Sequence, residues 1–141
     1  MNLRPCMFML ATLLAAPAAM AEGIPVEPGL WEITSTMKMP MLPEPRVTTV
    51  TECMEKSEIS MDDMGGEGMD PNCSFDVSEI DGKRMKWWFD CPVEGGTSHG
   101  EWEAVSEGDT VSGNGVITMS FQDQTMEMTM EWAGKRVGDC P

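Results

Sequence analysis

The sequence contains no tyrosine and a single histidine, His99. Histidine is the side chain used most often for general acid–base catalysis, and it also activates serine and cysteine nucleophiles. Ser98 precedes the histidine, but neither a specifically placed carboxylate nor a nucleophile-elbow motif accompanies the pair. Because these groups are missing, we identify no catalytic residue and expect the protein not to be an enzyme.

Basic residues are also scarce. The chain has 9 lysines and arginines against 24 aspartates and glutamates, and its formal net charge is −15. Nucleic acids and anionic membrane surfaces attract proteins through clustered positive charge. The charge balance therefore argues against nucleic acid as a partner, and in itself it indicates no more than a soluble surface.

Long apolar runs are missing except near the N-terminus. There, Arg4 precedes an apolar run that leads to the small-residue signal Ala19-Met20-Ala21, a pattern typical of a secretory signal peptide. The run is shorter than the ~20 residues that a membrane-spanning helix needs. We predict a cleaved signal peptide over residues 1–21, followed by a single β domain over residues 22–141 that is not transmembrane.

Four cysteines remain after the predicted signal peptide, since the fifth, Cys6, lies within it. An even number of cysteines in an exported chain favours disulfides over metal ligands or catalytic thiols, and the spacings match no zinc motif. We expect two disulfides and a periplasmic or secreted location. The four residues are Cys53, Cys73, Cys91 and Cys140.

Residues 73–91 form the clearest structural signal, because alternating apolar residues flank the turn dipeptide Asp81-Gly82. Side chains repeat every two residues along a strand, so one register pairs Phe75 with Phe89 and also places Cys73 opposite Cys91. This register predicts a Cys73–Cys91 disulfide, and Cys53 then pairs with Cys140 by elimination. A tail that turns back would permit Cys53 to pair with Cys73 instead.

The rest of the chain is typical of short antiparallel strands. Residues 31–39 and 47–53 predict two strands around a proline-rich loop, and residues 54–72 predict a long connection in which Ser57 caps a short helix containing Ile59, Met61 and Met64. Further strands follow around Trp102 and over residues 111–121 and 125–132. The fold class is mostly β: an antiparallel meander of about seven strands, either a curled sheet or a partly closed barrel.

Two turns fix registers in the second half of the chain. Gly108 suits the first position of a two-residue turn, which sets Trp102 opposite Gly115. A turn at Asp123-Gln124 sets Gly115 opposite Trp132, so that two indoles flank one glycine on the buried face. The predicted core residues are Trp31, Phe75, Trp87, Phe89, Trp102, Gly115 and Trp132.

Methionine is unusually frequent, at 16 residues. Two runs have alternate spacing, which on a strand projects thioethers from one face about 7 Å apart. Thioethers suit Cu(I), so copper is an alternative cofactor, although alternation with threonine and glutamate favours packing in the core. The candidate metal ligands are Met37, Met39, Met41, Met126, Met128 and Met130.

Motifs at both ends of the predicted domain resemble those of one family. They are Pro28-Gly29-Leu30-Trp31-Glu32, the four cysteines in this order, and the closing residues 134–140 (GKRVGDC). Together they resemble the exported bacterial family catalogued as domain of unknown function 3617. The resemblance implies a small secreted or periplasmic protein without an assigned activity, and it supplies no catalytic residue.

Two kinds of partner remain open for such a domain. A barrel lined by methionine and tryptophan can hold a small apolar ligand, although a filled and a hollow core look alike in the sequence. Alternatively, Trp88 and Lys86, which have the opposite parity to Trp87, predict either a second covered face or a contact surface for an envelope protein.

Overall fold

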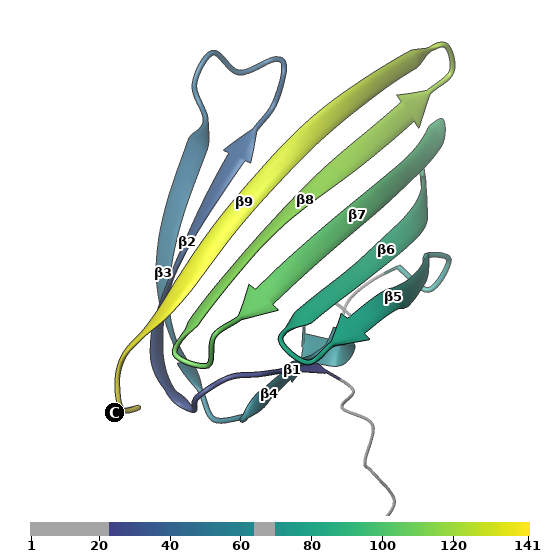
Figure 1. Ribbon diagram of the computed structural model, residues 1–141. Coiled ribbons are helices and arrows are strands. Elements are labelled where there is room, and N and C mark those ends of the chain that lie inside the picture. The colour runs from purple at the N-terminus through teal and green to yellow at the C-terminus, as the bar shows by residue number, and fades with distance from the viewer. Residues whose placement is uncertain (1–22, 64–69) are drawn as a thin grey trace, which may run out of the picture.

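The computed structural model describes residues 23–63 and 70–141 (Figure 1). The predicted signal peptide, residues 1–21, therefore lies outside the described residues. The described residues form nine strands, and all long strands are joined in an antiparallel arrangement. The strands are β1 (Gly23–Pro25), β2 (Gly29–Lys38), β3 (Arg46–Met54), β4 (Glu58–Ser60), β5 (Ser74–Asp81), β6 (Arg84–Val93), β7 (Gly96–Ser106), β8 (Thr110–Phe121) and β9 (Gln124–Gly138).

Seven strands form one sheet in the order β3-β2-β9-β8-β7-β6-β5. Strands β5 to β9 follow one another as a meander, and the C-terminal strand β9 then pairs with β2. The sheet curls without closing into a barrel, so β3 and β5 remain as edges (Figure 1). The prediction of a mostly β antiparallel meander of about seven strands is confirmed.

A second sheet of two short strands, β1 and β4, covers one end of the large sheet. Ile24 of β1 pairs with Ile59 of β4, so Ile59 lies in a strand and the prediction that places it in a helix is wrong. Pairing with a distant strand overrides the local pattern here. Met64, the last residue named in the predicted helix, lies outside the described residues. Helical backbone begins at Met61, and Ser60 is the residue before it, with its N–H donating to Asp63 Oδ2 at 2.9 Å.

The β5–β6 hairpin has the predicted register, because Phe75 faces Phe89 and Val77 faces Trp87. The turn residues are Gly82 and Lys83 rather than Asp81 and Gly82, and Gly82 has φ 54°. This turn sets Asp81 opposite Arg84, and a β-bulge between Val77 and Glu79 then shifts the pairing by one residue, which brings Val77 opposite Trp87.

The β8–β9 register differs from the prediction by two residues. The turn residues are Gln122, with φ 50°, and Asp123, so Trp132 faces Gly113 instead of Gly115. A shift of two residues preserves the face of every side chain. The β7–β8 register is as predicted, because Gly108 with φ 95° opens the turn and Trp102 faces Gly115.

The face of the large sheet that packs against β1 is called the inner face here. It carries the odd-numbered residues of β2, β6 and β8 and the even-numbered residues of β3, β7 and β9. Its closed end is the part covered by β1 and β4, and there the core is found. The buried apolar core residues are Ile24, Val26, Trp31, Met85, Trp87, Ala104 and Val111.

The predicted core residues divide between the two ends of the inner face. Trp31 and Trp87 are buried at the closed end, and Trp102 and Trp132 pack against them partly buried. Phe89 is half-buried, and Phe75 is 42% exposed. The prediction that Phe75 is a core residue is wrong, because it lies on the edge strand β5 beyond the cover of β1 and β4.

Candidate functional site

The inner face continues past its cover as an apolar surface, which is called the open end here. Its large side chains are half-buried. On β6 to β9, Arg136 at the closed end is the single charged residue at an inner-face position. The outer face of β9, in contrast, carries Glu127, Thr129 and Glu131. The open end consists of Met37, Phe89, Ile117, Met119, Phe121, Met126, Met128 and Met130.

Aromatic rings lie over glycines of neighbouring strands along this face. A Cβ on Gly115 would lie 2.2 Å from the Trp102 ring, and one on Gly113 would lie 2.3 Å from the Trp132 ring. Phe89 covers Gly100 in the same way, at 2.1 Å. The predicted row of two tryptophans about Gly115 is therefore wrong, since each indole covers a glycine of its own. Small residues on one strand leave room for rings from the next.

The methionines of the second run share the inner face, as predicted from their spacing. Met130 faces Met37 across β9 and β2, and Met126 faces Met119 across β9 and β8, with Met128 between them. All five are half-buried and lie outside the buried core. Met119 is not among the ligands predicted from the sequence, although its alternation with Ile117 and Phe121 was a usable signal.

The first methionine run does not form a single strand face. Strand β2 ends at Lys38, so Met39 and Met41 lie in the following loop. Met41 is 76% exposed. The prediction that Met37, Met39 and Met41 project together from one strand is wrong, because the proline-rich loop begins immediately after Lys38.

A pocket of about 670 Å³ opens between β3, β2, β9 and β4. This volume lies within the range of small-molecule sites, roughly 300–1,000 Å³. Its wall combines apolar side chains with a charged rim, and the apolar residues are Ile33, Met54, Ile59 and Trp132.

On the rim of this pocket, Lys56 pairs with Asp63. The hydrogen bond from Lys56 is the largest influence on the Asp63 carboxyl, followed by the bond from the Ser60 backbone, and together they lower its pKa to about 2. Asp63 is therefore ionised at all physiological pH values. The pair joins the segment before β4 to the residues after it, at the rim of the pocket.

His99 lies on the outer face, away from the inner face that carries Ser98. Its Nδ1 is 2.7 Å from Asp90 Oδ1, and its Nε2 is 3.9 Å from Glu101 Oε1. The expectation that His99 lacks a carboxylate partner is thus wrong, since the β6–β7 pairing places Asp90 directly opposite. The imidazole remains half-exposed, and the strand alternation separates it from the Ser98 hydroxyl.

Trp88 and Lys86 share the outer face, as their parity predicts. Trp88 is half-buried, and Lys86 forms ion pairs with Glu79 at 3.3 Å and Glu103 at 3.8 Å. Both ion-pair partners of Lys86 therefore lie on neighbouring strands of the same sheet.

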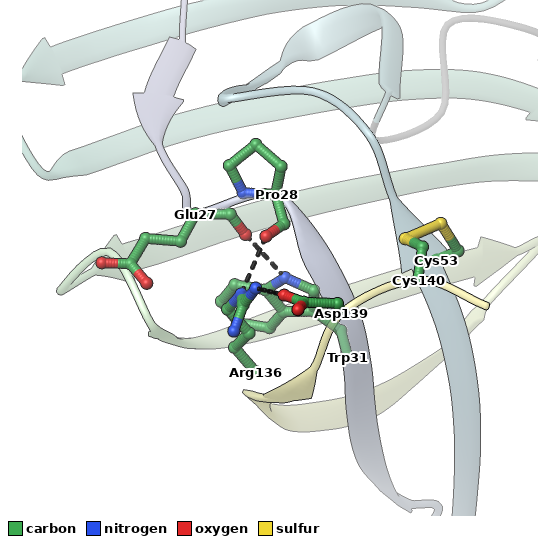
Figure 2. The surroundings of a disulfide bond; sticks show 7 residues. All are labelled: Glu27, Pro28, Trp31, Cys53, Arg136, Asp139 and Cys140. Carbon is green, nitrogen blue, oxygen red and sulfur yellow. Dashed lines mark hydrogen bonds and ion pairs between the residues drawn. A yellow bond between two sulfur atoms is a disulfide. The ribbon is translucent and has the colours of Figure 1, made fainter.

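The terminal motifs meet at the closed end, where residues 27–31 contact residues 136–140 (Figure 2). The Trp31 indole N–H donates to the Glu27 carbonyl at 2.9 Å, and Arg136 Nε donates to the Pro28 carbonyl at 2.8 Å. Arg136 also pairs with Asp139. We call this group, together with the Cys53–Cys140 disulfide, the clasp. Its contacts are internal, so the most distinctive motifs serve the fold.

The second disulfide, Cys73–Cys91, joins β6 to the residue that precedes β5, and the pairing agrees with the one inferred from the hairpin register. Each edge of the large sheet is therefore tied by a disulfide. Among residues 23–63 and 70–141, no group of three or more histidine, cysteine or acidic side chains is arranged to hold a metal ion. Nor does that part of the chain contain a helix long and apolar enough to span a membrane.

Comparison with known proteins leaves the site without a characterised counterpart. No curated protein matches the chain, and no solved structure does. A family model does match, over residues 26–140, a span that includes both motifs of the clasp and the whole open end. The chain therefore belongs to the family described as "Protein of unknown function (DUF3617)".

Proposed function

We propose that this is an exported, non-enzymatic envelope protein that holds an apolar chain, such as the acyl chain of a lipid, against the open end. One observation carries the proposal: on β6 to β9 the inner face stays apolar and carries no charge beyond the point where β1 and β4 cease to cover it. Contiguous exposed apolar surface is rare on soluble proteins and often marks a binding site.

The composition of the open end supports an acyl chain as the ligand. Methionine side chains are flexible and polarisable, so they adapt to chains of varied shape. Burial contributes about 25 cal/mol for each Å² of apolar surface removed from water, without the need for a specific polar partner. The pocket beside Ile33 and Trp132 continues the same surface toward a charged rim, which provides a place for a polar headgroup.

Export is proposed on independent grounds. Two disulfides favour an oxidising compartment. The signal-peptide pattern of residues 1–21 supports secretion across the inner membrane.

The test compares two neighbouring substitutions on β9. Met128→Glu places a charge on the inner face, whereas Thr129→Glu places the same charge on the outer face. We expect the first to weaken the binding of dansyl-labelled undecanoic acid at least about tenfold and the second to leave it unchanged. Native mass spectrometry of the periplasmic protein should detect a co-purified lipid. Equal binding by both variants would refute the proposal.

A second candidate function is Cu(I) binding, and the facing pairs Met37–Met130 and Met119–Met126 favour it. Facing strand residues have Cβ atoms roughly 4.5–5.5 Å apart, so their flexible thioethers can reach one ion. The double variant Met119→Leu/Met126→Leu separates the two functions, because leucine keeps the apolar volume and removes sulfur. Loss of Cu(I) binding with dansyl-undecanoate binding retained would establish a metal site.

A further inference from the structure

The two edges of the large sheet are built differently. The β5 edge carries Asp76, Glu79 and Asp81, and a β-bulge interrupts its pairing with β6 after Val77. Charges and bulges on an edge strand are the usual means of preventing pairing with another chain. The β5 edge is therefore protected.

The β3 edge lacks such protection. Residues 47–51 are all valine or threonine, and β3 pairs with β2 in an unbroken register over its whole length. Its side chains are exposed, including Val47 at 61% and Val50 at 49%. Only Arg46 and Glu52 carry charge on the strand, one near each end. A long, regular β-branched edge is a template for an added strand.

The β3 sequence is complementary to itself in one antiparallel register. With Thr49 opposite Thr49 of a second copy, Arg46 lies opposite the second copy's Glu52, and the reverse pair forms by symmetry. A shift of two residues in either direction would place Arg46 opposite Val50 or Met54. In this register even-numbered residues of β3 lie opposite even-numbered residues of the second copy. The inner faces of the two sheets therefore lie on the same side of the joined sheet.

We propose that the protein dimerises through antiparallel pairing of β3 with β3 of a second copy. The product is one continuous sheet in which two open ends face the same side. The Cys53–Cys140 disulfide fixes the end of β3 next to Glu52, which holds this edge in place for pairing. Two Arg46–Glu52 pairs specify the register.

Substitutions that reverse the charge of Arg46 or Glu52 test the proposal. Sedimentation of the mature chain over a range of concentrations measures the dimer dissociation constant. Arg46→Glu and Glu52→Arg each place like charges opposite one another, so each should raise that constant at least about tenfold. The double variant Arg46→Glu/Glu52→Arg should restore dimerisation, and an equimolar mixture of the two single variants should form heterodimers.

Asp76→Lys, on the protected β5 edge, is the matched control and should leave the dissociation constant unchanged. Near-ultraviolet circular dichroism checks that each variant is folded. A chain that stays monomeric at all concentrations would overturn the proposal. So would a dimer that is insensitive to the Arg46 and Glu52 substitutions, since it would use another surface.

Discussion

The closed and open ends of the inner face belong to the same strands and follow the same alternation, yet they differ in cover. At the closed end, Trp31 is 1% exposed and Met85 is fully buried beneath β1 and β4. At the open end, the equally apolar Phe89 and Met128 are half-buried, and Phe75, opposite Phe89 on β5, is 42% exposed. Both ends are apolar, so the difference in burial comes from the cover that β1 and β4 provide at one end only.

Hydrogen bonds of residues 25–28 explain why the cover stays at one end. Glu27 donates its N–H to the Gly108 carbonyl, and Ser106 donates its hydroxyl to the Pro25 carbonyl, so the N-terminal segment is held against the β7–β8 turn. Arg136 then holds Pro28 to β9. These contacts hold the cover at the closed end and leave the open end outside it.

Alanine substitutions of Trp31 and Phe75 should differ most in their effect on the free energy of unfolding. Trp31→Ala should lower the free energy of unfolding by about 3–5 kcal/mol, because a fully buried ring and its hydrogen bond to Glu27 are lost. Phe75→Ala should lower it by about 1 kcal/mol or less. Urea denaturation measures both values, and similar losses would contradict the division into two ends.

The two disulfides provide the next contrast. The Cys53–Cys140 bond at the closed end spans 87 residues, and the Cys73–Cys91 bond at the open end spans 18. Replacing both cysteines of a pair by alanine should cost about 2–4 kcal/mol, with the larger loss for Cys53–Cys140 by roughly 1 kcal/mol, because it closes the longer loop. Thermal unfolding of the two double variants checks the order. A larger loss for Cys73–Cys91 would be inconsistent with the entropic account.

Glycines at the boundary of the two ends give a smaller effect. Gly115→Val should lower the free energy of unfolding by roughly 1–3 kcal/mol, because its Cβ would overlap the Trp102 ring. Gly138→Ala is the control, since no atom lies within 4 Å of its Cβ position. Chemical denaturation of both variants tests whether the indole packs as described. Equal tolerance at both sites would argue against it.

The smallest effect is a pH dependence at the pocket rim. Asp63 has its pKa lowered from 3.8 to about 2 in the folded protein. Its contribution to stability is therefore present above the ordinary value and is lost as the pH falls through the lowered one. Asp63→Asn should flatten the change in unfolding free energy between about pH 4 and pH 2. An unchanged profile would show that Lys56 and Asp63 do not interact in solution.

The sequence predicts most of the fold because local signals repeat along it. Alternation and glycine turns give the β5–β6 and β7–β8 registers, and the β5–β6 register gives the Cys73–Cys91 bond. The β8–β9 register is missed because Gln122 adopts a positive φ that favours glycine. Ile59 is misplaced because its partner, Ile24, is distant in the sequence. Which half of an apolar face is covered depends on such distant pairings, so the open end could not be located from the pattern.

Methionine methyl resonances can show whether the open end binds an apolar chain. A spin-labelled stearic acid, added to protein carrying carbon-13-labelled methionine methyl groups, broadens the resonances that lie near it. We expect broadening of Met119, Met126 and Met128, with no change at the buried Met85 or at Met41 in the exposed loop. Preferential broadening of Met41, or no broadening at the open end, would contradict the account.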